Sequence, residues 1–115
     1  MANVTYDENC LTVLDHPLVG HKMTILRDES TAPAHFRKLV HELAALEAYE
    51  ATRDLPTTQV QVKTPICETE GVRLKDDALA VVPILRAGMG MLEGVLSVVP
   101  SAAVGVLGME RDEET

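Results

Sequence analysis

The chain has 115 residues, 46% of them hydrophobic, which is enough for one globular domain and too little for several. It carries 18 Asp and Glu against 10 Lys and Arg, and the resulting formal charge of −8 argues against nucleic-acid and anionic membrane partners. Two separated cysteines and a start without a secretory pattern predict a reduced, cytoplasmic protein. The longest apolar stretches are too short to cross a membrane.

The first half of the chain predicts two helices. Residues 10–14 indicate a short strand, which must end before Pro17. Residues 18–27 carry apolar side chains at helical spacing, and the acidic, hydroxyl-bearing residues 28–31 are typical of a cap for the next helix. That helix is predicted over residues 33–53. Its apolar face consists of Phe36, Leu39, Val40, Leu43, Leu46 and Ala51.

The second half predicts strands. Residues 58–63 alternate polar and apolar side chains, which indicates a half-exposed strand, and residues 71–74 are expected to return beside it after a turn at residues 67–70. The nearly continuous apolar run at 78–85 is typical of a parallel strand buried on both faces. A glycine-containing turn at 86–90, a helix at 91–99 and a second apolar strand at 103–109 complete a βαβ unit.

The turn after the first apolar strand is the leading candidate site, because ligands of open α/β sheets bind beyond the carboxyl ends of the strands. Arg86 offers a permanent cation whose fork matches phosphate oxygens. Gly88 and Gly90 let the backbone approach a ligand, and the N–H groups that begin the helix suit an anion. The alternative is an ordinary βα turn with a solvated arginine.

Arg111 follows the second strand of the unit, at the same edge of the sheet as Arg86. Two arginines at one edge could clamp a doubly charged group such as pyrophosphate. The alternative is a surface arginine paired with Asp112 or Glu114. Neither the cysteines nor the histidines have the partners that a nucleophile or a metal site needs, so no catalytic and no metal-ligating residue is assigned.

Several segments together resemble one enzyme family. Residues 14–22 read Leu-Asp-His-Pro-Leu-Val-Gly-His-Lys, residues 49–55 read Tyr-Glu-Ala-Thr-Arg-Asp-Leu, and residues 82–91 read Val-Pro-Ile-Leu-Arg-Ala-Gly-Met-Gly-Met. Residues 36–39, 99–102 and 108–115 continue the pattern in the same order. With this spacing the chain resembles uracil phosphoribosyltransferases over nearly its whole length.

The resemblance implies an α/β fold, a type I phosphoribosyltransferase-like parallel sheet with N-terminal hood segments. The hood and a β-hairpin would occupy about residues 1–77, and the βαβ unit residues 78–115. It implies a reaction in which uracil and phosphoribosyl pyrophosphate (PRPP) give UMP and pyrophosphate in pyrimidine salvage. Arg86 and Arg111 would contact PRPP. The pyrophosphate loop would comprise Ala87, Gly88, Met89 and Gly90.

The same resemblance implies Mg²⁺ as cofactor, GTP as a possible allosteric activator, and a homo-oligomer. The sequence departs from the family's pattern in two places. Glu110 stands where the family usually has an aromatic residue, and its charge would disfavour a nearby pyrophosphate. The family's later PRPP loop and uracil-binding segment do not occur in these residues, so we expect a sheet truncated after the first βαβ unit and an inactive chain.

Two other classes stay open at this stage. One is a non-catalytic binding or interaction module that keeps the hood and the oligomer-forming surface. The other is a nucleotide-binding regulator on the same fold, against which the charge of −8 argues if its target is a nucleic acid. PRPP-dependent turnover separates the enzyme from both.

Overall fold

The computed structural model describes residues 11–75 and 79–112. Helix α1 (Pro17–Arg27) confirms the first predicted helix. Pro17 occupies the first turn, where a missing N–H costs nothing, and the ring Nδ1 of His16 accepts a hydrogen bond from the N–H of Leu18 at 3.1 Å. The strand predicted at 10–14 is wrong for residues 11–14, which run without regular structure and have no partner strand, while Cys10 lies outside the described residues.

Helix α2 (Pro33–Ala51) confirms the second predicted helix, two residues shorter than expected. The prediction that residues 28–31 cap it is wrong, because its N-cap is Ala32 and no side chain bonds to the helix start. Asp28 instead accepts hydrogen bonds from the N–H and hydroxyl of Ser30, and the hydroxyl of Thr31 donates to the carbonyl of Ile25. These polar residues therefore close the end of α1.

The core lies where α2 packs against α3 (Met89–Val98). Its buried side chains are Leu39, Leu43, Ala44, Ala48 and Val99. Gly94 of α3 sits at the crossing, where an added Cβ would lie 2.8 Å from that of Ala44 and closer still to the carbonyl of His41. Phe36, expected on the apolar face of α2, is 45% exposed because it lies one turn before this contact.

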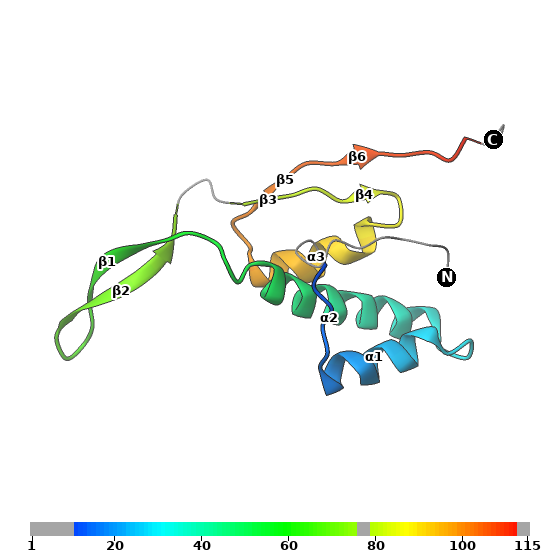
Figure 1. The fold of residues 1–115 in the computed structure, drawn as a ribbon, viewed down its shortest axis with the longest axis horizontal. Helices are drawn as coiled ribbons and strands as arrows, with labels where there is room; N and C mark the ends of the chain where they lie inside the picture. The colour runs from blue at the N-terminus through cyan, green and yellow to red at the C-terminus, as the bar shows by residue number, and fades with distance from the viewer. Residues whose placement is uncertain (1–10, 76–78, 113–115) are drawn as a thin grey trace.

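Strands β1 (Thr57–Lys63) and β2 (Glu68–Leu74) form an antiparallel hairpin whose register runs from Thr57↔Leu74 to Lys63↔Glu68. The hairpin is as predicted, but its turn is at residues 64–67, earlier than expected. The hydroxyl of Thr64 organises this turn by donating to the carbonyl of Cys67 and accepting from its N–H. The hairpin projects away from the helices, which lengthens the molecule to 62 Å (Figure 1).

The parallel strands come in short pieces. β3 (Ala80–Val81) pairs with β5 (Ala103–Val104), and β4 (Ile84–Leu85) pairs with β6 (Leu107–Gly108). The N–H groups of Ala103, Gly105 and Leu107 donate to the carbonyls of residues 79, 81 and 83, so one ladder runs through both pairs. It is interrupted at Pro83, which has no N–H to donate.

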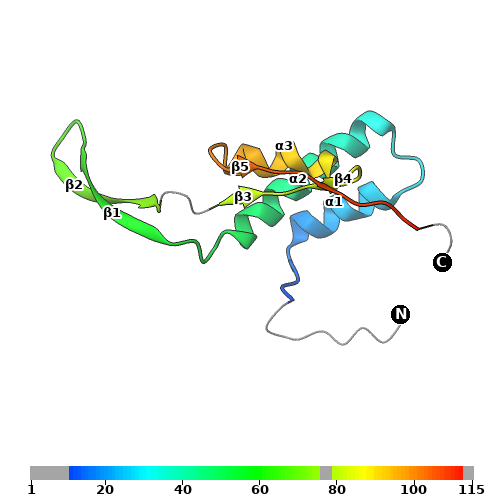
Figure 2. The ribbon, with the colours of Figure 1, turned by 90° about the horizontal axis from the view of Figure 1, so that it is seen from above.

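These strands are not buried on both faces, which corrects the sequence prediction. Along residues 79–85 the odd-numbered side chains are buried or half-buried and the even-numbered ones are exposed. Residues 103–109 are exposed on both faces. Figure 1 shows the reason, because β5 and β6 lie farthest from α3 and α2, and β3 and β4 lie between. Figure 2, seen from above, places nothing else of the described chain over them.

Candidate active site

The predicted pyrophosphate loop follows β4 directly. The Leu85–Arg86 peptide bond is cis. Helix α3 begins at Met89, two residues earlier than predicted, so Met89 and Gly90 belong to its first turn and the loop proper is Arg86, Ala87 and Gly88. No described glycine has a positive φ. Gly88 is required for another reason, since an added Cβ would lie 2.7 Å from the carbonyl oxygen of Ile84.

The backbone N–H groups from Gly88 to Met91 are already used. Gly88 donates to Ile84, Met89 to Arg86, Gly90 to Ala87 and Met91 to Gly88, at 2.8 to 3.4 Å. Within the described chain, the N–H groups of Arg86 and Ala87 donate to no carbonyl. The sequence argument expected the start of α3 to present its N–H groups to an anion. Among the described residues of this segment, it is Arg86 and Ala87, the two residues before Gly88, whose N–H groups have no carbonyl partner.

The ends of β4 and β6 meet at one edge, as the βαβ prediction required. A hollow there is lined by Leu85, Arg86, Gly108, Met109 and Glu110. Arg86 is exposed, and within residues 11–75 and 79–112 its guanidinium makes no ion pair. Among the described residues, the hollow therefore holds a guanidinium without an ion-pair partner and, from the other strand, the carboxylate of Glu110 that the sequence marked as a departure.

Arg111 lies one residue beyond this hollow and does not line it. Its side chain is exposed, and in the part of the chain that is described it has no ion-pair partner. The structure thus brings Arg86 together with Glu110 and leaves Arg111 at the same edge, outside the hollow. Glu114, one of its alternative partners, lies outside the described residues.

Sequence reasoning missed a second hollow on the other side of the loop. It lies between α2 and α3 and is lined by Phe36, Arg37, Val40, His41, Ala87, Met89, Gly90, Leu92 and Glu93. Arg37 and His41 are one helical turn apart, so they share a face of α2. That i, i+4 pair of basic side chains was the available signal, although nothing in the sequence indicates that α2 passes beside the loop.

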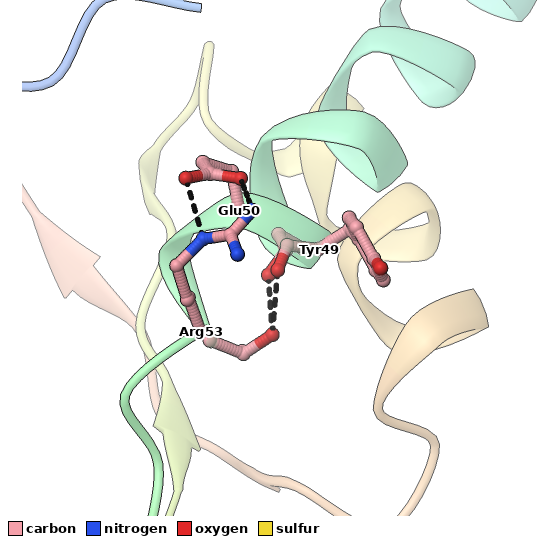
Figure 3. Close-up of polar contacts among 5 residues, drawn as sticks. Tyr49, Glu50 and Arg53 are labelled. Carbon is pink, nitrogen blue, oxygen red and sulfur yellow. Dashed lines mark hydrogen bonds and ion pairs between the residues drawn. The ribbon is translucent and has the colours of Figure 1, made fainter.

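Arg53 differs from Arg86 because its charge is already compensated. Its Nε and Nη2 donate to the two carboxylate oxygens of Glu50 at 2.9 and 2.7 Å, a two-pronged ion pair at the end of α2 (Figure 3). The hydrogen bond from Arg53 lowers the pKa of the Glu50 carboxyl. Both side chains line two hollows, whose other walls come from residues 12–19 and from the end of α2. A paired guanidinium attracts an anion less than an unpaired one does.

The donors for a metal ion do not fit a resident site. Among the described residues, no three His, Cys, Asp or Glu side chains come together closely enough to hold a metal. Of the described residues that line the hollow beside Arg86, Glu110 alone carries a carboxylate. No described helix is both long and apolar enough to cross a membrane.

Comparison with known proteins decides the family. The family model described as "Uracil phosphoribosyltransferase" matches residues 13–115. The chain belongs to the uracil phosphoribosyltransferase family. This confirms the resemblance that the segments at 14–22, 49–55 and 82–91 carried.

Curated relatives in the family are identical to the chain at more than half of the aligned positions. It is 58% identical over 105 residues to a uracil phosphoribosyltransferase of Streptomyces avermitilis and 52% identical over 105 residues to one of Symbiobacterium thermophilum. Each match covers 91% of this chain and 50% of the relative. The chain thus spans about half the length of the curated relatives it matches.

A solved structure shows the same arrangement of elements. The AQ2163 protein of Aquifex aeolicus is similar to the chain with a TM-score of 0.81 and 41% identity, over 90% of this chain and 50% of that one. The mixed α/β fold with parallel strands is confirmed by this likeness.

Proposed function

We propose that the chain supplies the pyrophosphate-binding part of a uracil phosphoribosyltransferase, which makes UMP and pyrophosphate from uracil and PRPP. The observation that carries the proposal is Arg86 at the end of β4, which has no ion-pair partner among the described residues and lies in the hollow shared with the end of β6. Beside it the N–H groups of Arg86 and Ala87 are free among the described residues. A fork-shaped cation next to free N–H donors suits a phosphate group.

The chemistry asks this part of the enzyme to stabilise a leaving group. A uracil ring nitrogen forms a bond to C1 of the ribose, the bond from C1 to the pyrophosphate oxygen breaks, and the proton of that nitrogen is released. Negative charge grows on the departing pyrophosphate. Arg86 in the hollow, and Arg111 at its rim, would neutralise that charge, and such preorganised cations lower the barrier most where charge develops.

Glu110 opposes this role at short range. Its carboxylate lines the same hollow as Arg86 and would repel a pyrophosphate there. Two features reduce this repulsion. Both side chains are exposed to water, and in the described chain no ion pair with Glu110 neutralises Arg86. The chain is therefore expected to bind pyrophosphate more weakly than a relative with an aromatic residue at this position.

Further properties belong to the same proposal. Mg²⁺ would arrive with the phosphates of PRPP, because the described residues form no metal cluster of their own. We also propose a homo-oligomer, activation by GTP, and a role in pyrimidine salvage in the cytoplasm. The exposed apolar residues of the parallel strands support self-association.

A non-catalytic module is the second candidate. The observation that favours it is length, because the chain spans half of its relatives. On this alternative the chain would keep binding surfaces without turnover. UMP formation separates the two candidates.

The experiment measures pyrophosphate and PRPP binding by titration calorimetry, together with UMP formation from uracil, PRPP and Mg²⁺, with and without GTP. Arg86→Ala is expected to weaken binding by about 10- to 100-fold, the loss of one charge-assisted contact. Arg73→Ala, an exposed arginine on β2 in the hairpin, is the matched control and should leave binding unchanged.

Equal binding by the chain and its Arg86→Ala variant would contradict the proposed role of Arg86. The chain alone is expected to bind without making UMP. UMP formed by the chain alone, and lost in Arg86→Ala, would show that these residues already assemble a working site and would overturn the expectation of an incomplete enzyme.

A further inference from the structure

The hollow at the ends of β4 and β6 carries two opposite charges. Arg86 comes from the loop after β4, and Glu110 comes from the segment after β6. Both side chains are exposed, and among the described residues no ion pair joins them. The other lining residues, Leu85, Gly108 and Met109, carry no charge. A ligand that fills the hollow therefore meets a guanidinium from one strand end and a carboxylate from the other.

A metal-free phosphate ligand satisfies the guanidinium and not the carboxylate. Its oxygens match the fork of Arg86, and the N–H groups of Arg86 and Ala87, which donate to no carbonyl in the described chain, add two further donors. The carboxylate of Glu110 has no proton to donate when it is ionised, so it cannot hydrogen-bond to the phosphate oxygens. Glu110 therefore repels this form of the ligand.

A divalent cation carried by the phosphates reverses the effect of Glu110. Mg²⁺ prefers oxygen ligands, and proteins commonly hold it with one or two carboxylates together with the phosphates of a substrate. The described residues include no cluster that could hold the ion by itself. Glu110 nevertheless supplies a carboxylate to this hollow. One carboxylate is too few for a resident metal ion, and it is enough for an ion that enters already bound to phosphate.

We propose that Glu110 is a specificity-determining residue, which makes the hollow select the Mg²⁺ complex of a pyrophosphate group over the metal-free anion. Arg86 binds the phosphate oxygens, and Glu110 attracts the metal ion that they carry. The inference rests on the proposed function, because it takes the pyrophosphate group to occupy this hollow. It adds which form of that group this chain accepts.

The test measures the affinity of the full chain for inorganic pyrophosphate by titration calorimetry, once with excess Mg²⁺ and once with a chelator. The parent chain is expected to bind the Mg²⁺ complex more tightly than the metal-free anion. Glu110→Gln keeps the shape of the side chain and removes its charge, so it should bind the metal-free anion more tightly than the parent does. The ratio of the two affinities should fall by about 5- to 30-fold in this variant, because the two added charges of the ion no longer face a carboxylate.

Two further variants separate the charge at this position from other effects. Glu110→Asp keeps a carboxylate and should retain the preference for the Mg²⁺ complex. Glu93→Gln removes an exposed carboxylate of α3 that lines the hollow on the other side of the loop, so it should leave the preference unchanged. Circular dichroism checks that each variant keeps the fold of the parent.

Mn²⁺ in place of Mg²⁺ locates the metal ion, because it accepts the same oxygen ligands and is paramagnetic. With pyrophosphate present, it should broaden the NMR signals of the backbone amides of Gly108 and Glu110. Mn²⁺ alone should leave these signals sharp, because the ion enters with its phosphate ligands.

The outcomes distinguish this inference from the proposed function. Equal affinity ratios for the parent and Glu110→Gln, with binding that Arg86→Ala still weakens, would overturn the inference and leave the proposed function standing. Equal broadening by Mn²⁺ without pyrophosphate would also overturn it, since that result would show a resident metal site. Pyrophosphate binding that is absent, or that Arg86→Ala does not change, would contradict the proposed function and this inference together.

Discussion

The helix pair and the parallel strands of this chain differ in how completely their contacts are satisfied. At the α2–α3 crossing, Leu39, Leu43 and Ala44 are buried and Gly94 allows the two backbones to meet. On β5 and β6, side chains that are just as apolar face solvent. Apolar character alone therefore does not bury a residue. Burial needs a partner surface, and the described chain supplies one to α2 and not to the outer strand.

The largest expected effect is on the free energy of unfolding, when a leucine is shortened to alanine in each of the two regions. Leu43→Ala should reduce the free energy of unfolding by about 2–5 kcal/mol, because it leaves a cavity in the packed crossing. Leu107→Ala on β6 removes the same atoms from a side chain that is 49% exposed, and it should change stability by about 0.5 kcal/mol or less. Urea denaturation, at a concentration where the chain sediments as one species, measures both. Equal losses would show that the strands are packed in the isolated chain.

A smaller effect tests how close the helices lie. Gly94→Ala should cost about 1–3 kcal/mol, because its Cβ would press on the Cβ of Ala44 and the backbone of His41. Gly20→Ala in α1 is the control, since a Cβ there meets nothing within 4 Å, and it should stabilise the chain by about 0.5–1 kcal/mol through helix propensity. Thermal unfolding compares the two. A neutral Gly94→Ala would mean that α3 can move away from α2.

The smallest effect concerns the ion pair between Lys22 of α1 and Glu42 of α2. Lys22 Nζ donates to Glu42 Oε2 at 2.6 Å, and this hydrogen bond lowers the pKa of Glu42 below its ordinary 4.5. A lowered carboxyl pKa contributes stability above pH 4.5, and that contribution is lost as the pH falls through the lowered pKa. Glu42→Gln should therefore be slightly less stable than the parent chain at neutral pH.

The difference between Glu42→Gln and the parent should vanish in acid, where Glu42 is protonated in both the folded and the unfolded chain. Urea midpoints measured at neutral pH and at successively lower pH, until the difference no longer changes, measure it. A difference that persists at the lower pH would assign the effect to packing or hydrogen bonding and not to charge.

Local patterns in the sequence predicted the elements well. Helical spacing located α1 and α2, polar–apolar alternation located β1, and an unbroken apolar run located the strand that Pro83 divides. One error concerns polar residues whose partners are decided by geometry. Asp28 and Thr31 close α1 although they also look like a cap for α2, because the chain turns back at that point and leaves the carbonyl of Ile25 within reach.

The candidate site was likewise predicted only in part from the sequence. The sequence by itself determined the family, the order of the elements, and the position of Arg86 at the end of a strand, since these depend on residue identity and spacing. Only the tertiary structure decided that Glu110 shares a hollow with Arg86, that Arg111 stays outside it, and that Arg37 lies on the other side of the loop. Those contacts join segments far apart in the chain, and their distances depend on how α2 and the two strands pack. For the same reason the sequence predicted strands buried on both faces. It encodes how apolar they are, and the packed chain determines what covers them.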